Sequence, residues 1–151
     1  DLGRRRLQLA AVLQFFLPGI PCIYYGDEAG LTGYRDPFNR CTYPWGREDT
    51  ELLAFFRTLS RTRQKSPAVA VGDFLPLTVT ADLGVFLRRS LQGESLVALN
   101  RGERPEQIPL PPTFASVEPT ILCGSWDGRE LGPLGSAVWH RFSTAGVAEN
   151  D

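Results

Sequence analysis

The sequence contains little histidine and little cysteine, with one histidine and three cysteines among 151 residues. Cys22, Cys41 and Cys123 form neither an even set nor a close CxxC pair, which argues against a disulfide framework and against zinc ligation. The single histidine, His140, stands in an apolar run near the end of the sequence and is typical of a sheet residue rather than a catalyst. We therefore expect no metal site and no other cofactor.

The sequence also lacks an excess of charge of either sign and a long apolar run. It has 16 Lys and Arg against 17 Asp and Glu, so nothing favours nucleic acid or an anionic membrane as a partner. The longest apolar region, residues 7–25, is broken by Gln8, Gln14 and Pro18, whereas a membrane-spanning helix needs about 18 uninterrupted residues. No leader pattern opens the sequence. We expect no nucleic acid, no membrane segment and a cytoplasmic location.

The first 70 residues contain two helical patterns on either side of a short apolar run. A stripe at i, i+3, i+4 and i+7 predicts a helix, covered on more than one side, that ends at residues 18–19. Residues 20–25 lack polar alternation, which is typical of a parallel strand buried on both faces. Residues 48–50 supply helix-start side chains for a second helix, which should end at residues 64–66 because Pro67 follows. The first stripe consists of Leu9, Val12, Leu13 and Phe16.

Two carboxylates, Asp27 and Glu28, follow directly after the predicted strand. In a (β/α)8 barrel the reactive face is built from loops at the carboxyl ends of the strands, so the order helix, strand, loop, helix fits one βα repeat and the helix before it. With 151 residues against about 250 for a whole barrel, the chain can supply only a piece. The alternative is a structural loop whose acids cap the next helix or pair with a neighbour.

From residue 69 onward the pattern changes to short β-rich runs separated by turn signals, which predicts an antiparallel sandwich. Residues 91–94 are expected to connect two of these strands as a hairpin. Residues 145–151 are typical of a frayed tail. The predicted strands cover residues 72–79, 84–89, 95–100, 107–110, 120–123 and 137–142.

Long motifs between Gly19 and Trp45 carry a resemblance to a known family. The run PGIPCIYYGDEAG continues into GLTGYRDPFNR and YPWG, and together these resemble the end of the catalytic barrel in the alpha-amylase superfamily of glycoside hydrolases. The most similar branch is that of the neopullulanases, cyclomaltodextrinases and maltogenic amylases. The resemblance extends back through residues 6–17 and forward through residues 52–63, and beyond residue 70 it becomes generic.

This resemblance implies a mixed fold, with the last βα repeat of a (β/α)8 barrel in residues 1–68. An all-β antiparallel sandwich domain would follow in residues 69–144, and a tail in residues 145–151. The full-length parent would hydrolyse α-1,4 bonds, and in some members α-1,6 bonds, in maltodextrin, cyclodextrin or pullulan with retention of configuration. Its partner would be an α-glucan oligosaccharide. A bare apolar barrel face would also favour self-association of the chain.

The resemblance places the catalytic groups outside this chain. The nucleophilic aspartate, the acid/base glutamate and the stabilising aspartate of the family follow the fourth, fifth and seventh barrel strands, upstream of Asp1. Retaining glycosidases need two carboxyl groups about 5 Å apart, but Asp27 and Glu28 are neighbours leaving a strand and tend to point to opposite sides. We therefore expect no catalytic residue here and no activity from the isolated chain.

The family analogy instead implies a sugar-gripping role for Asp36 and Arg40, at a subsite on the non-reducing side of the cleaved bond. A carboxylate accepts from sugar hydroxyls and a guanidinium donates in a planar fork, and such charge-assisted bonds are strong. Tyr34 is the third candidate for substrate binding, and Trp45 and Phe38 could also contact a sugar. The alternative for Asp36 and Arg40 is a surface salt bridge worth at most about 1 kcal/mol.

Two other functions stay open from the sequence. The chain could be a non-catalytic module for carbohydrate binding or protein interaction, which would need exposed coplanar aromatic side chains. It could also be part of an α-glucosidase or a trehalose-forming relative. Most aromatic residues of the second half stand in runs typical of a core, and the GYRDPFNR loop favours the neopullulanase branch.

Overall fold

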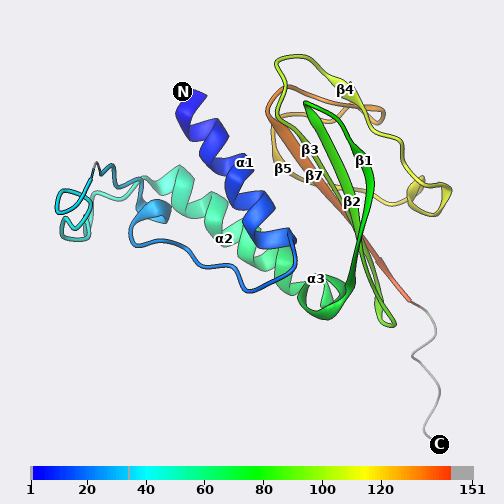
Figure 1. The fold of residues 1–151 in the computed structure, drawn as a ribbon, viewed down its shortest axis with the longest axis horizontal. Coiled ribbons are helices and arrows are strands. Elements are labelled where there is room, and N and C mark those ends of the chain that lie inside the picture. Colours follow the sequence, from blue (N-terminus) through cyan, green and yellow to red (C-terminus); the bar gives the residue numbers. More distant parts are fainter. Residues whose placement is uncertain (1, 34, 144–151) are drawn as a thin grey trace, which may run out of the picture.

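The computed structural model describes residues 2–33 and 35–143. Three helices lie on one side of an antiparallel sheet, and a small ribbon with its loops lies on the other side (Figure 1). The predictions made for Tyr34 and for the tail at residues 145–151 lie outside the described residues.

The two long helices are α1 (Leu2–Phe16) and α2 (Thr50–Gln64), which pack against each other. Both end where the sequence predicts, the first just before Pro18-Gly19 and the second at Gln64. The carboxylate of Asp49 accepts a 2.9 Å hydrogen bond from the backbone N–H of Leu52 and so caps α2. Within the described residues, none of the helices combines the length and apolar character needed to cross a membrane.

The buried stripe of α1 differs from the predicted one. Leu9, Val12 and Phe16 are buried as their spacing predicts, and Phe15 joins them, whereas Leu13 is 40% exposed. The expectation that α1 is covered on more than one side is therefore wrong for this structure. The reason is that α2 and the sheet cover α1 from one side, and the opposite side faces solvent.

The predicted buried strand at residues 20–25 is also wrong for this structure. These residues adopt no regular structure, Ile20 is 96% exposed, and Tyr24 and Tyr25 are more than half exposed. A parallel strand needs a neighbour to pair its backbone N–H and C=O groups, and the strands described in this chain all pair among themselves elsewhere. The short 3-10 helix η1 (Asp27–Ala29) follows this segment.

The main sheet orders its five described strands as β1-β2-β3-β7-β5, all antiparallel. A short helix α3 (Pro67–Val71), which the sequence did not predict, leads from α2 into the sheet. The predicted hairpin is confirmed, because β2 and β3 flank a turn at Leu91-Gln92. The strands are β1 (Asp73–Val79), β2 (Leu83–Ser90), β3 (Gly93–Asn100), β5 (Thr120–Cys123) and β7 (Gly135–Phe142).

A second layer covers the far face of this sheet, but it is smaller than the sandwich prediction requires. It contains the two-stranded ribbon of β4 (Glu106–Gln107) and β6 (Glu130–Leu131) and the 3-10 helix η2 (Pro112–Phe114). The strand predicted at residues 107–110 shrinks to β4, because the surrounding prolines have no N–H to donate to a ladder. The prolines of this region are Pro105, Pro109, Pro111 and Pro112.

The two faces of the main sheet belong to different hydrophobic clusters. Phe86, Val97 and Val138 point to the helices and pack with α1 and α2. The alternate positions point to the ribbon, where Trp139 is 1% exposed and packs beside Phe114. One continuous core therefore joins the helices to the sheet, and a second core holds the ribbon against it.

Candidate functional site

The Asp36 loop, defined here as residues 31–46, extends beyond η1 and the start of α2 at the end of the molecule farthest from the sheet (Figure 1). Within it, Asp36 and Arg40 form a two-pronged ion pair. The Nε of Arg40 lies 2.6 Å from Oδ1 of Asp36, and Nη2 lies 3.0 Å from Oδ2. Both side chains are exposed, so their remaining donor and acceptor positions face solvent.

Two consecutive turns bring the pair together. The N–H of Phe38 donates to the carbonyl of Arg35 at 3.1 Å, and the N–H of Arg40 donates to the carbonyl of Pro37 at 3.0 Å. These bonds wind the backbone so that Asp36 and Arg40 stand four residues apart on the same side. The DPxxR spacing seen in the sequence therefore places the side chains of Asp36 and Arg40 in direct contact.

The turn closes where Gly33 meets Asn39. A Cβ atom on Gly33 would lie 2.7 Å from the Cα of Asn39, which is closer than real side-chain atoms approach. Glycine is required at this contact because a side chain has no space. The Asn39 side-chain oxygen is buried with no hydrogen-bond partner among the described residues.

An exposed row of aromatic rings accompanies the loop. The rings of Tyr25 and Tyr43 lie 6.2 Å apart, and those of Tyr43 and Trp45 lie 4.6 Å apart. Trp45 is 81% exposed and Phe38 is exposed nearby in the sequence. Sequence reasoning singled out Trp45 and Phe38 but missed Tyr25 and Tyr43. The signal was available, since aromatic residues recur here within a segment rich in glycine and proline.

Asp27 and Glu28 occupy a partly buried position behind this row. One carboxylate oxygen of Glu28 is buried and has no hydrogen-bond partner among the described residues. Burial, and after it the neighbouring charge of Glu28, raises the pKa of Asp27. Desolvation and the facing Glu28 carboxylate also raise the pKa of Tyr43. The structure thus links Asp27 to Glu28, and Glu28 to Tyr43 of the aromatic row. Asp49 rather than either acid caps α2.

The end of the Asp36 loop is anchored to both long helices through Asp49. Its N–H donates to the carbonyl of Ala29 at 3.0 Å, which ties η1 to the start of α2. Its carboxylate accepts from Nη2 of Arg4 in α1 at 2.7 Å and from the N–H of Leu52 at 2.9 Å. The side chain of one residue therefore connects α1 to α2, while its backbone connects α2 to η1.

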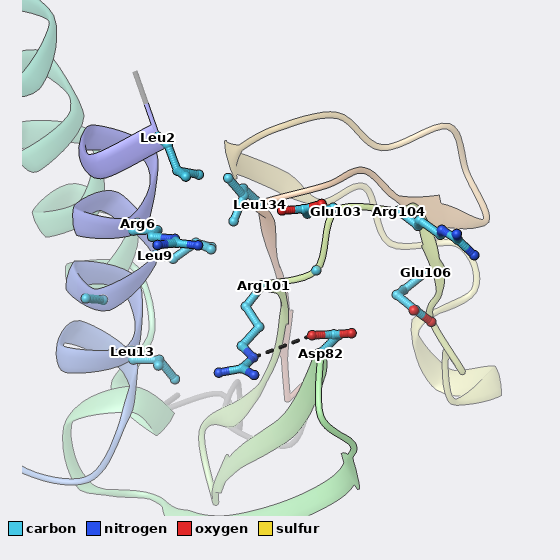
Figure 2. Close-up of a pocket in the computed structure, with 12 residues that line it drawn as sticks. Leu2, Arg6, Leu9, Leu13, Asp82, Arg101, Glu103, Arg104, Glu106 and Leu134 are labelled. Atoms are coloured by element: carbon cyan, nitrogen blue, oxygen red, sulfur yellow. Dashed lines mark ion pairs between the residues drawn. The ribbon is translucent and has the colours of Figure 1, made fainter.

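A separate cleft of about 960 Å³ lies between α1 and the ends of the sheet strands, as Figure 2 shows. Leucines of α1 and Leu134 contribute apolar surface, and charged side chains, among them Arg6 and Glu106, also line it. On the sheet side of the cleft Arg101 and Asp82 form an ion pair at 3.5 Å. None of the described residues of the Asp36 loop lines this cleft, so Asp36 and Arg40 lie outside it.

Comparison with known proteins gives three informative similarities, although no family model matches the chain. An amylopullulanase from Thermoanaerobacter thermohydrosulfuricus is 42% identical over 114 residues, covering 68% of this chain and 8% of the relative. A cyclomaltodextrinase from a Bacillus species is 39% identical over 104 residues, covering 66% of this chain and 19% of the relative. The solved ligand-free cyclic alpha-maltosyl-(1→6)-maltose hydrolase from Arthrobacter globiformis superposes with a TM-score of 0.74 and 31% identity, covering 93% of this chain and 30% of that one.

The chain belongs to the alpha-amylase family. The resemblance noted in the sequence is thereby confirmed, and the structural similarity extends it from the first 70 residues to nearly the whole chain. This member of the family spans between 8% and 30% of the length of the three relatives. It therefore corresponds to a small part of each.

Proposed function

We propose that this chain is the C-terminal part of a neopullulanase-like glycoside hydrolase that cleaves α-glucosidic bonds in maltodextrin, cyclodextrin or pullulan. The similarity to an amylopullulanase and a cyclomaltodextrinase supports this substrate class. Residues 1–68 would supply the last βα repeat of the parent's barrel, and residues 69–144 the β domain that follows it. The cytoplasmic location expected from the sequence stays a prediction.

The observation that carries a substrate role is the exposed fork of Asp36 and Arg40. An exposed ion pair stabilises a fold by at most about 1 kcal/mol, so stability alone gives little reason for this geometry. Sugar hydroxyls both donate and accept, and they can therefore bond to the carboxylate and the guanidinium at once. In this proposal Asp36 and Arg40 grip one glucose unit on the non-reducing side of the cleaved bond, with Tyr34 as a third contact.

The chain by itself is proposed to be inactive. Asp27 and Glu28 are partly buried sequence neighbours, and Glu28 acts on Tyr43, whereas glycoside hydrolysis requires two carboxyl groups that flank the scissile bond. The catalytic carboxylates implied by the family resemblance would come from the upstream part of the parent.

Hydrolysis of pullulan and β-cyclodextrin tests these assignments. We expect no activity from the present chain and clear activity from a longer chain that includes the upstream barrel. In that longer chain, Asp36→Ala and Arg40→Ala should each lower kcat/KM by roughly tenfold or more, since each removes a charge-assisted bond worth about 1.5–3 kcal/mol. Unchanged circular dichroism spectra would show that the fold is intact.

The pair formed by Asp82 and Arg101 offers a matched control. It has the same residue types and a similar exposure, but it lies beside the cleft of Figure 2 instead of in the Asp36 loop. Asp82→Ala and Arg101→Ala should leave hydrolysis within about twofold of the parent, because exposed pairs contribute little to stability. Hydrolysis by the present chain would overturn the placement of the catalytic groups, and an equal loss from both pairs would overturn the subsite assignment.

We also propose that the present chain self-associates through the apolar surface that α1 and the segment after it expose. Leu13, Ile20, Ile23 and Tyr24 are all exposed along this surface. Contiguous exposed apolar groups favour association because burying them removes apolar area from water.

A further inference from the structure

A row of polar side chains crosses the helix-facing side of the sheet at one level. The strand register places Arg88 of β2 opposite Ser95 of β3, and Ser95 opposite His140 of β7. Two residues along the same strands, the next level is apolar and contains Phe86 and Val97. Polar residues therefore enter the helix–sheet interface at a defined position.

Arg88 holds the ends of two helices at this level. Its guanidinium donates to the carbonyl of Phe16, the last residue of α1, at 3.2 Å and to that of Gly72, just after α3, at 2.7 Å. The side chain is 2% exposed. Helix C-termini carry partial negative charge, so a buried cation that donates to their carbonyls is well placed.

Ser95 and His140 continue the row toward α2. The Oγ of Ser95 lies 2.8 Å from Nδ1 of His140 and also forms a hydrogen bond with the hydroxyl of Ser66, the residue that precedes α3. Both serines are buried. The other imidazole nitrogen, Nε2, is buried as well and has no hydrogen-bond partner among the described residues. The backbone of Thr62 in α2 acts on the same ring.

Cations face this chain of hydrogen bonds from the surrounding elements. Lys65 at the end of α2 acts on His140 and disfavours the charged imidazolium. Arg88 lies in the same row, where burial lowers its pKa and Arg63 of α2 lowers it further. A proton added to His140 would therefore enter an electropositive region.

The nearby carboxylates are engaged elsewhere. Asp73 acts on Arg88, where it opposes the lowering of the Arg88 pKa by burial and by Arg63. Glu94, next to Ser95, points to the opposite face of the sheet and pairs with Arg89 and Arg141, each at 2.5 Å. Burial is the main influence on His140 and lowers its pKa; Lys65 lowers it further, and the backbone of Thr62 acts in the opposite direction.

We propose that His140, Ser95 and Ser66 form a pH-sensitive latch, which holds the junction of α2 and α3 on the sheet while the imidazole is neutral. In the neutral state that we propose, the imidazole proton is on Nε2, so Nδ1 accepts from Ser95, and Ser95 accepts from Ser66. A protonated ring must donate from Nδ1, so Ser95 has to turn its hydroxyl toward Ser66, and Ser66 has to give up its donation. Protonation thus reverses a buried hydrogen-bond chain and adds a charge beside Lys65.

The direction of the pH effect follows from the lowered pKa. As pH falls, the histidine of the unfolded chain takes up its proton first, at about pH 6.5. The stability that the latch contributes is therefore fully present above about pH 6.5 and is lost as pH falls from there through the pKa of the folded state. The loss begins near pH 6.5, above the ordinary pKa values of carboxylates, and a variant that lacks the histidine separates its titration from theirs.

An NMR titration of the whole chain tests the latch directly, because His140 is the single histidine and its imidazole signals need no further assignment. We expect its titration midpoint below about pH 6.5, with the amide signals of Ser66 and Ser95 shifting at the same midpoint. A midpoint at or above that value, or serine amides that do not respond to it, would overturn the proposal.

Substitutions provide a second, independent measurement. The urea concentration at which half of the natural chain is unfolded should be lower at about pH 5.5 than at about pH 7.5. His140→Gln cannot titrate at this position and should show a clearly smaller decrease. Lys65→Gln should move the His140 titration to higher pH because it removes a neighbouring cation. Arg101→Gln, an exposed cation remote from the row, should leave that titration unchanged. An equal fall in the natural chain and in His140→Gln would contradict the latch.

Discussion

The β2–β3–β7 part of the sheet and the segment at residues 20–25 are both apolar in sequence, yet the structure buries the first and exposes the second. Strands β2, β3 and β7 pair with one another and bury nearly all of their apolar side chains. The residues of the segment lie without a strand partner and are largely exposed. Apolar composition alone does not bury a strand, because its backbone groups must also find partners.

The strongest way to sharpen this comparison is to truncate one tryptophan of the sheet and one of the Asp36 loop, which is exposed like residues 20–25. Trp139→Ala should lower the free energy of unfolding by about 3–5 kcal/mol, because the side chain fills the core between the sheet and the ribbon. Trp45→Ala, in the Asp36 loop, should stay within about 0.5 kcal/mol of the natural chain. Urea unfolding followed by circular dichroism gives both values. Similar losses would show that the loop is packed as firmly as the sheet.

The exposed region should also govern association, which light scattering across a concentration series can measure. We expect the mass of the natural chain to rise with concentration to at least about twice the monomer, since association removes its exposed apolar surface from water. Replacing Ile20 and Tyr24 by serine should weaken this rise, whereas replacing Leu91 by serine, an exposed residue of the β2–β3 turn, should leave it unchanged. A constant monomer mass would refute self-association.

A smaller effect is expected where the Asp36 loop joins the helices. Asp49→Ala should cost about 1 kcal/mol of stability because α2 loses its N-terminal cap. Asp49→Asn should cost less, since asparagine also caps helices; its loss measures the ion pair with Arg4, and the difference between the two variants measures the cap. Urea midpoints at neutral pH measure both changes. Equal losses from the two variants would assign the effect to the ion pair instead of the cap.

The sequence predicted most of the regular structure, for reasons that are local. The helix ends follow from Pro18-Gly19, from Pro67 and from a capping side chain at Asp49. The hairpin at residues 91–94 and the strand at residues 120–123 follow from turn signals and β-rich runs. Sequence analysis did not predict α3 and β6. These elements are short and contain too few residues to show a hydrophobic period.

The candidate site was predicted unevenly. The motif DPxxR indicated Asp36 and Arg40 together, and the structure brings them into a two-pronged contact. The partnership of Tyr25 and Tyr43 with Trp45 was missed, because residues 18 positions apart in sequence meet only through the path of the intervening loop. The buried strand was predicted wrongly for this structure, since its burial depends on neighbours and not on its own composition.

The sequence by itself determined the family, the helices, the strand-rich second half and the pairing of Asp36 with Arg40, because each depends on residues that are close in the chain. Only the tertiary structure decided that Arg88, Ser95 and His140 share one row across the sheet. Strand register sets that alignment, and register is fixed by long-range packing of the apolar residues on each face.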